Sequence, residues 1–329
     1  MLALLFIPHI TQFTQFKFQR RFTVNIQKAN FQNESDYVQS ANTLFNFMSK
    51  PEYLYQALRN QFLAPRYCKE NIEYLNLRLD RRKIKHIYVL EKCFCDIPMH
   101  SLVTPFDLQV IKPKRMKKEI RQRIEAENTH PKLYGEYAIS FSKEWGKKHE
   151  LEQIHYVQNN TSYVNTTLSR SINTLVKYDN LSDEVSEDYI NRLCYLKPLH
   201  GEMERNVPIG DDFQSVTVWK NFNDECEWRY VPSVSTEQKF SISRMYVNIP
   251  DQKIIDTLNN VISQPEYMNV GLTFDFSDIQ YLIVPNNTAR IALIKEIENI
   301  FKELPKYSII DKNLLISKII LLSDIKKDW

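Results

Sequence analysis

Hydrophobic positions along the chain follow two different periods, which predicts that strands and helices interleave. Runs rich in β-branched and aromatic residues, such as residues 84–90 (IKHIYVL), are typical of buried strands. Apolar residues at helical spacing predict a helix over residues 51–62, where Leu54, Leu58 and Phe62 share a face and Pro51 opens the first turn. The expected strands are residues 40–48, 84–90, 137–141, 154–157, 225–231, 281–284 and 314–322, and the expected helices are residues 51–62, 116–127, 162–178, 184–195, 254–262 and 288–301. This order of elements indicates the α+β class, with mixed sheets and interleaved helices.

The chain of 329 residues is long enough to bury a large core in one domain. We expect this domain at residues 39–329, with a basic helical insertion at about residues 102–128. The first 33 residues contain no acidic side chain, and no small-residue cleavage site follows an apolar segment. Residues 1–38 are therefore expected to be a poorly packed N-terminal extension rather than a targeting or membrane-touching segment.

Glycine is scarce in this chain. There are 5 glycines, whereas an average content of about 7% would give about 23. Phosphate-cradling loops need closely spaced glycines, because only glycine lets the backbone approach a phosphate closely. No spacing among the glycines matches a Walker loop, a dinucleotide-binding G-x-G-x-x-G or a kinase lid. The composition therefore excludes P-loop NTPases, Rossmann dehydrogenases and protein kinases.

Charge, apolar runs and cysteines favour a soluble cytoplasmic protein. The 43 Lys and Arg residues nearly balance the 40 Asp and Glu residues, so the net charge of +3 requires no polyanionic partner. The longest apolar runs, such as residues 1–7, are far shorter than the roughly 18 residues of a membrane span. The 5 cysteines lack C-x-x-C spacing, which favours reduced thiols over a zinc or redox site.

The segment from Lys112 to Arg123 is strongly basic. Such a run can bind nucleic acid by neutralising phosphates. No aromatic residues interleave these charges and no DNA-binding motif surrounds them, so a solvated helix is the stronger interpretation. Nucleic acid is kept as a minor alternative partner at this segment.

Glu225 and Glu227 form an E-x-E pair inside an expected strand. Alternation along a strand would point both carboxylates to one face. Two carboxylates on one face would suit a site that binds a sugar hydroxyl and stabilises an oxocarbenium-like transition state. The alternative is structural: Glu227 lies on an edge strand and pairs with Arg229 across the same face. From the spacing alone, the ion pair is the more common arrangement.

A second candidate group surrounds the expected strand 137–141. His130, Tyr134 and Tyr137 are side chains that can hydrogen-bond a ribose or stack on a nicotinamide ring. His130 directly precedes Pro131, and capping a loop is the commoner role for such a histidine.

Residues 93–100 hold weaker candidates. Asp96 and His100 can bind metals, but no third and fourth ligand is spaced to join them, so no metal site is expected. Cys93 and Cys95 lie in an apolar segment, which tends to raise the pKa of a thiol and disfavours a nucleophilic role.

A series of short segments in a fixed order carries a family signal. The segments are CFCDIP at residues 93–98, the H-x-x-x-Y-G-x-Y pattern of His130, Tyr134, Gly135 and Tyr137, ISFSKEWG at 139–146, Lys197-Pro198 with Gly201, EWRYVP at 227–232, DIQYLIVP at 278–285 and SKIILLSDIKKDW at 317–329. Together they resemble the AbiGi family of bacterial abortive-infection (phage resistance) proteins. The resemblance covers roughly residues 40–329, and only the combination of segments is specific.

This resemblance implies that the chain is the antitoxin-like member of a two-gene system. The other member of such systems looks like a nucleotidyltransferase toxin. More distantly, the order CF(C/S), an aromatic-glycine strand and E-x-E-W-R is similar to bacterial proteins that resemble the ADP-ribosyltransferase fold. That fold holds NAD between two small sheets without a glycine-rich loop. The likeness implies a catalytic Glu227, with Tyr134 or Tyr137 against the nicotinamide. Asn46 lies where such transferases often place Arg or His on NAD.

Two functions in phage defence follow from these observations. In the first, a cleft binds NAD, and the protein transfers ADP-ribose or hydrolyses NAD. The residues expected to be catalytic are Glu227, Glu225 and His130, and those expected to bind NAD are Tyr134, Tyr137 and Asn46. In the second, the protein is not an enzyme and instead restrains a partner toxin or senses a phage component.

Overall fold

The computed structural model describes residues 41–328, except residues 80, 112–115, 117, 119, 120, 123, 125–127, 177–182, 210–211 and 248–250. The expected N-terminal extension at residues 1–38 lies outside the described residues. Most of the basic segment considered for nucleic acid lies outside them too. Residues 39–329 form one compact unit.

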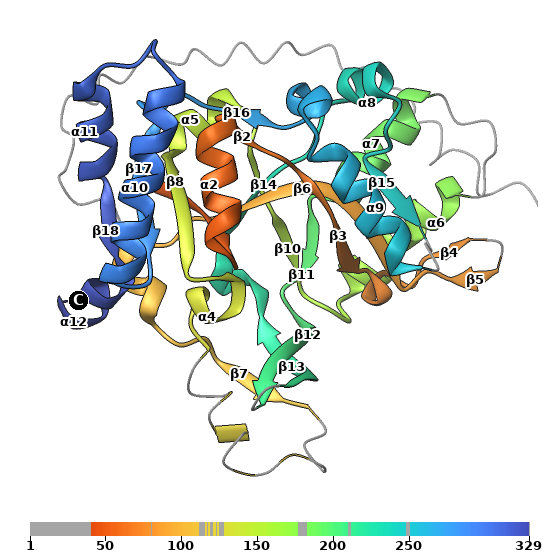
Figure 1. Cartoon of the computed structure of the whole chain (residues 1–329). Helices are drawn as coiled ribbons and strands as arrows, with labels where there is room; N and C mark the ends of the chain where they lie inside the picture. Colours follow the sequence, from red (N-terminus) through yellow and green to blue (C-terminus); the bar gives the residue numbers. More distant parts are fainter. Residues whose placement is uncertain are drawn as a thin grey trace, which may run out of the picture. The chain divides into compact units, whose positions relative to one another are not determined.

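The centre of this unit is a nine-stranded mixed sheet, shown in Figure 1. Along its main path the strands follow the order β18-β17-β8-β1-β6-β14-β9, and β3 and β15 also pair with β6. Paired strands in this sheet run antiparallel except β17 and β18, which run parallel. The strands are β1 (Thr43–Met48), β3 (Arg66–Asn71), β6 (His86–Cys95), β8 (Tyr137–Ser142), β9 (Glu152–Gln153), β14 (Glu227–Tyr230), β15 (Met245–Val247), β17 (Ile279–Val284) and β18 (Ile319–Leu321).

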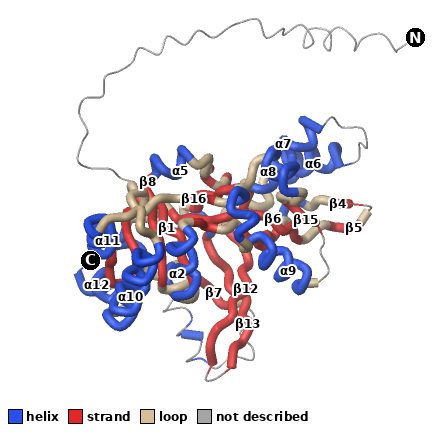
Figure 2. The backbone as a smooth tube through the Cα atoms, turned by 45° about the horizontal axis from the view of Figure 1, so that its top comes forward, coloured by secondary structure: helices blue, strands red, loops and turns tan. Residues whose placement is uncertain are grey.

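Smaller sheets surround the main one. The largest contains a long hairpin, β12 and β13, which extends away from the main sheet in Figure 2, with β7 paired to β13. The strands of these sheets are β2 (Phe62–Leu63) with β16 (Leu272–Thr273), β4 (Arg78–Leu79) with β5 (Arg82–Lys83), β10 (His155–Val157) with β11 (Leu196–Pro198), and β7 (Leu108–Val110) with β12 (His200–Ile209) and β13 (Asp212–Asn221).

The described helices cover the main sheet and its edges. Helix α10 packs against β17, β18 and α2, whereas α9 packs against β3. The α-helices are α2 (Pro51–Asn60), α4 (His130–Tyr134), α5 (Lys143–Lys148), α6 (Ser169–Val176), α7 (Asp183–Cys194), α8 (Val234–Phe240), α9 (Gln252–Ile262), α10 (Asn287–Glu303), α11 (Ile309–Ser317) and α12 (Leu322–Asp328). A π-helix at Tyr163–Leu168 precedes α6, and 3₁₀ turns lie at Glu73–Leu75, Met99–Val103, Phe222–Glu225 and Pro265–Val270. Among the described helices, none is long and apolar enough to cross a membrane.

Strand β8 is buried on both faces because helices cover the sheet on both sides. Ile139 and Phe141 belong to the cluster that includes the apolar face of α10. Ala138 belongs to a different cluster, which includes residues of α12. The Phe141 ring stacks on Trp145, with ring centroids 4.0 Å apart. Each fully buried side chain of this size contributes about 1.5–3 kcal/mol to the free energy of unfolding, so β8 is a central stabilising strand.

Most predicted elements are confirmed. The α+β class with mixed sheets is correct, and strands or helices lie where they were expected over most of the described chain. The helix at residues 51–62 is present as α2, with Pro51 in its first turn. The strand expected at residues 84–90 is longer than predicted, because β6 continues through Cys95.

Two expected strands are partly wrong. The strand at residues 225–231 begins only at Glu227, because the Asn221 side chain caps a 3₁₀ turn that includes Glu225, and Cys226 then takes a left-handed conformation (φ 43°). The strand at residues 314–322 is reduced to β18. A capping box of Ser308 and Asp311 starts α11 just upstream, and this helix continues to Ser317.

Candidate functional site

The candidate site lies at a gap along one edge of β6. Strand β1 pairs with this edge only through Phe45, opposite Cys95. Strand β3 pairs with residues 86–91 of the same edge. The opposite edge of β6 carries β14 and β15. Between β1 and β3, the Asn46 side chain takes the place of a strand: its Nδ2 donates to the carbonyl oxygen of Cys93 at 2.7 Å. The end of one strand and the start of another therefore frame an opening in the sheet.

A cavity of about 320 Å³ occupies this gap. Five of the six predicted site residues line it, and Tyr137 does not. Tyr137 lies on β8 opposite Met48 and packs against the core cluster of α2 and α10. The lining residues are Phe45, Asn46, Phe47, Arg66, Cys68, Glu70, Glu91, Lys92, Cys93, Phe94, Cys95, His130, Tyr134, Lys197, Glu225 and Glu227.

The two carboxylates of the E-x-E pair meet at one lysine. The Nζ atom of Lys197 lies 2.8 Å from Glu227 Oε2 and 3.3 Å from Glu225 Oε2. Strand alternation does not produce this convergence, because Glu225 is in a 3₁₀ turn rather than on β14. The left-handed turn at Cys226 instead precedes the strand and separates the two glutamates. The expected proximity is real, but its expected cause is wrong.

Arg229 is the centre of a group of ion pairs that we call the ion cluster. Its members are Glu70, Glu91, Lys197, Lys220, Glu225, Glu227 and Arg229. The Arg229 side chain is fully buried and contacts three carboxylates: Glu227 Oε1 at 2.8 Å, Glu70 Oε1 at 2.8 Å and Glu91 Oε2 at 2.9 Å. Its Nη1 also donates to the carbonyl oxygen of Cys194 at 2.6 Å. The ion pair of Glu227 and Arg229 anticipated from the sequence is thus confirmed, although β14 is not an edge strand, since β9 flanks it.

Lys220, on strand β13 of the hairpin β12–β13, also belongs to the ion cluster. Its buried ammonium contacts the carboxylate of Glu225 and lies 2.8 Å from the Tyr134 hydroxyl. The Tyr134 hydroxyl in turn donates to Glu225 Oε1. The Lys220 ammonium also lies 3.9 Å from the ring centre of Phe106, a cation–π distance. Glu225 is therefore held by two lysines and a tyrosine.

Burial and ion pairing oppose each other in the pKa values of these carboxyls. Burial by itself would raise the pKa of Glu225, but the charges of Lys197 and Lys220 outweigh it and lower the pKa to about 2. Burial likewise opposes ionisation of Glu227, yet Arg229 and Lys197 hold its pKa well below the usual range. For Glu91, burial dominates over Arg229 and raises the pKa well above its usual value. Of these three carboxyls, Glu225 and Glu227 are held in the ionised form, whereas Glu91 resists ionisation.

His130 and the cysteines of the cavity are poor nucleophiles or bases in this setting. Burial, reinforced by the charge of Lys220, lowers the pKa of His130 to about 3, so the imidazole is neutral at pH 7. His130 opens α4 and packs between aromatic rings rather than capping an exposed loop. Burial raises the pKa of both Cys93 and Cys95, as their apolar segment predicted.

One group of side chains has metal-ligand spacing. In the part of the chain that the structure describes, the donor atoms of Glu91, Cys93 and Glu227 lie within 4.8 Å of one another. Arg229 already neutralises both carboxylates. A metal would also need the Cys93 thiolate, which burial disfavours by raising its pKa. This group is accounted for as part of the ion cluster.

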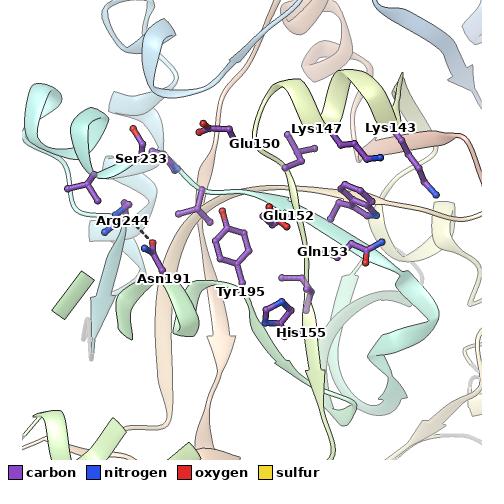
Figure 3. Close-up of a pocket in the computed structure, with 16 residues that line it drawn as sticks. Lys143, Lys147, Glu150, Glu152, Gln153, His155, Asn191, Tyr195, Ser233 and Arg244 are labelled. Atoms are coloured by element: carbon purple, nitrogen blue, oxygen red, sulfur yellow. Dashed lines mark hydrogen bonds between the residues drawn. The ribbon is translucent and has the colours of Figure 1, made fainter. Parts of the chain in front are cut away.

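A larger pocket lies on the other face of β14. Glu227 and Arg229 point into the ion cluster, whereas Trp228 between them lines a pocket of about 1110 Å³. Figure 3 shows Tyr195 and His155 within this pocket, with Lys147 and Arg244 on different sides of it. Arg244 Nη1 donates a hydrogen bond to Asn191 Oδ1 at 2.7 Å. Both acidic and basic side chains line the pocket, so the pocket has no single charge sign.

Sequence reasoning missed Glu70, Glu91 and Lys220 as members of the cluster. Glu91 had a usable signal, because it is a single acid within the apolar run of β6. Lys220 had a similar signal, because it is a lysine that follows the apolar strand residues Val216 and Val218. A charged side chain inside a buried strand needs a partner, so each position signals a buried ion pair without revealing the partner.

Comparison with known proteins places this site in a family. Residues 124–285 match the family model of the abortive phage resistance protein AbiGi, which is described there as an antitoxin. The abortive phage resistance protein AbiGi of Lactococcus lactis subsp. cremoris is 30% identical over 277 residues, covering 80% of this chain and 98% of the relative. The chain belongs to the AbiGi family. The resemblance inferred from the sequence segments is thereby confirmed.

The span matched by the AbiGi family model contains much of the ion cluster, including Lys197, Lys220, Glu225, Glu227 and Arg229. It also contains His130 and Tyr134 from the wall of the cavity. No solved structure matches the chain. The likeness to the ADP-ribosyltransferase fold stays a prediction.

Proposed function

We propose that this member of the AbiGi family acts in abortive phage resistance as an antitoxin-type protein, which binds a partner toxin and is not itself an enzyme. The description of the family model as an antitoxin supports this assignment. The structural observation that carries it is an exposed apolar face on helix α11.

Helix α11 exposes three large aliphatic side chains. Ile309, Ile310 and Leu314 are 67%, 65% and 56% exposed, respectively. Leu315, from the same helix, is buried in the main core and anchors α11 to the fold. A helix with apolar residues on both its buried and its exposed sides is typical of one that is covered by a second protein. We assign this face, defined by Ile309, Ile310 and Leu314, to the toxin.

A hollow beside this face extends the surface. A cavity of about 410 Å³ lies at the junction of α10 and α11 and includes Ile309 and Phe301 in its lining. Lys302 and Lys312 also line it. Figure 1 shows α11 at the periphery beside α10. A toxin that fits here would insert an apolar side chain into the hollow and place acidic groups near the two lysines.

The ion cluster supports the non-catalytic form of this proposal. A carboxylate that stabilises a developing oxocarbenium ion must direct its charge at the substrate. The Glu227 carboxylate is buried and already paired with Arg229 and Lys197. Catalysis on NAD would require these ion pairs to open, which costs several kcal/mol for buried charges. We therefore rank NAD-dependent ADP-ribosyl transfer or NAD hydrolysis second.

The test is co-expression with the product of the neighbouring gene, the toxin candidate, followed by co-purification. We expect the wild-type protein to form a stable complex and the double variant Ile310→Glu/Leu314→Glu to lose it. The matched control is Ile254→Glu, which introduces the same charge at an aliphatic residue on α9 that is 46% exposed, and it should retain the complex. Both variants should keep the wild-type melting temperature, because all three positions are exposed.

Two results would contradict the proposal in different ways. Lys147 lines the large pocket beside β14. If Lys147→Glu loses the complex and the α11 variant keeps it, the toxin binds at that pocket and not at α11. Consumption of labelled NAD by the purified protein, together with phage protection in the absence of any partner, would replace binding by catalysis.

A further inference from the structure

The cavity at the β6 gap contains polar atoms that the protein leaves without partners. Asn46 and His130 line the cavity, and both side chains are more than nine-tenths buried. Within the described residues, neither Asn46 Oδ1 nor His130 Nε2 has a hydrogen-bond partner. Buried polar atoms are normally paired, so two unpaired atoms on residues that line one cavity mark places where a bound molecule can supply the missing partner.

The orientation of Asn46 defines one requirement of that molecule. Its Nδ2 donates to the Cys93 carbonyl at 2.7 Å, and a flipped amide would place two oxygens against each other. The amide is therefore fixed with Oδ1 as the unpartnered atom. Because Oδ1 only accepts hydrogen bonds, the molecule must present an N–H or O–H donor.

Aromatic rings surround His130. The His130 ring centroid lies 4.4 Å from that of Phe106, 5.8 Å from Tyr134 and 6.1 Å from Phe47. The imidazole is neutral at pH 7, so it can donate or accept at Nε2 according to its tautomer. Aromatic walls of this kind favour a planar ring in the ligand.

The charge of the cavity favours an anion. Each of its four glutamates, at positions 70, 91, 225 and 227, contacts a lysine or arginine of the ion cluster. Lys92 and Arg66 also line the cavity, and in the part of the chain that the structure describes no carboxylate pairs with either one. Burial lowers the pKa of Lys92 to about 8, which leaves most of the lysine charged at pH 7.

The same two cations connect this cavity to a neighbouring one. A second cavity, of about 430 Å³, shares Phe47, Arg66, Lys92 and Tyr134 with the first. The two cavities are of the size that small-molecule sites have in proteins, about 300–1,000 Å³. An elongated ligand can therefore place its ring against His130 and its charged group at the shared boundary.

We propose that this double cavity binds a phosphorylated nucleoside, with an N–H of the base donating to Asn46 Oδ1 and the phosphate at Lys92 and Arg66. The base fits the aromatic surroundings of His130, and the phosphate fits Lys92 and Arg66, which pair with no carboxylate among the described residues. This site is separate from the α11 face, so its existence does not depend on toxin binding.

Isothermal titration calorimetry of the full chain with the common nucleoside 5′-monophosphates tests the proposal. We expect at least one of them to bind at a ratio of one to one. We expect the affinity to fall about tenfold or more in Lys92→Gln, because a phosphate contact is lost. Lys253→Gln removes an exposed lysine of α9 and is the matched control, for which affinity should be unchanged.

A second set of variants tests the hydrogen bond between the base and Asn46. Asn46→Ala should weaken binding of the nucleotide but not of inorganic phosphate, and Arg66→Gln should weaken both. These outcomes would overturn the proposal: no binding of any monophosphate at millimolar concentration, equal affinity for inorganic phosphate and the nucleotide, or binding that Lys92→Gln leaves unchanged. Melting curves of each variant show whether a loss of binding reflects a loss of fold.

Discussion

Arg229 donates two hydrogen bonds to a single oxygen of Glu227, from Nε at 3.0 Å and from Nη2 at 2.8 Å. The other oxygen of Glu227 faces Lys197. Each oxygen of this buried carboxylate thus contacts a cation, one oxygen the fully buried Arg229 and the other the partly buried Lys197. The first candidate for catalysis is therefore engaged in ion pairs within the fold, which predicts a structural role for Glu227.

Replacing Glu227 tests that assignment. Glu227→Gln removes the one carboxylate that pairs with both Arg229 and Lys197, and we expect a loss of about 3–5 kcal/mol in the free energy of unfolding. Denaturant unfolding at pH 7 measures it. Glu152→Gln, an exposed carboxylate on the neighbouring strand β9, should change stability by less than about 0.5 kcal/mol. Normal stability of Glu227→Gln together with lost phage protection would instead indicate a chemical role.

The depressed pKa of Glu225 predicts acid sensitivity. The folded-state pKa is about 2, whereas an unfolded Glu titrates near about 4.3. A lowered carboxyl pKa contributes stability that is present above the unfolded pKa and is lost as the pH falls towards the folded pKa, here up to about 3 kcal/mol. Unfolding free energies at pH 5 and pH 3 should therefore differ less for Glu225→Gln than for the wild type. Equal differences would show that Glu225 is not held ionised.

Glu91 predicts the opposite pH dependence. Burial raises its pKa well above the usual value, so the folded state favours the protonated form. Such a group contributes stability that is lost as the pH rises through the folded pKa. Glu91→Gln resembles the protonated form, and its stability relative to the wild type should improve between pH 5 and pH 8. A variant that becomes relatively weaker over that range would show that the ion pair with Arg229 dominates.

Gly135 predicts a severe loss of stability for any side chain. It links α4 to β8 with φ of 120°, and a Cβ there would lie 2.0 Å from the backbone oxygen of Met48. Since backbone atoms cannot move aside cheaply, we expect Gly135→Ala to cost about 3 kcal/mol or more. Glu136→Ala, which removes only the surface ion pair with Lys132, should cost less than about 1 kcal/mol. Thermal melting of the two variants checks the contrast.

Local pattern was enough to locate much of the candidate site. Apolar runs predicted β1, β6 and β8, and the strand position of Asn46 followed from them, whereas Cys93 lies in the part of β6 beyond the predicted strand. Titratable residues next to strand ends identified His130, Tyr134, Glu225 and Glu227, which do line one cavity. Tyr137 shows the limit of this reasoning, because its strand was predicted correctly but its side chain packs on the core instead.

Apart from the Glu227–Arg229 pair, the partners of the buried charges could not be read from sequence order. Arg229 contacts Glu70 and Glu91, which lie far from it along the chain and reach it only because β3 and β14 pair with opposite edges of β6. Lys220 reaches Glu225 because the 3₁₀ turn after β13 folds the chain back. These contacts depend on strand register, which pairs residues through space rather than along the chain.

The sequence by itself determined the α+β class, the family and five of the residues around the cavity, because periodicity and local motifs depend on neighbouring positions. Only the tertiary structure decided what those residues do with their charges. Burial makes an isolated carboxylate costly and a paired one stable, and whether a partner is present depends on the whole fold. Sequence spacing offered Glu227 both as a catalyst and as the partner of Arg229, and in the folded chain it is the counter-ion of Arg229.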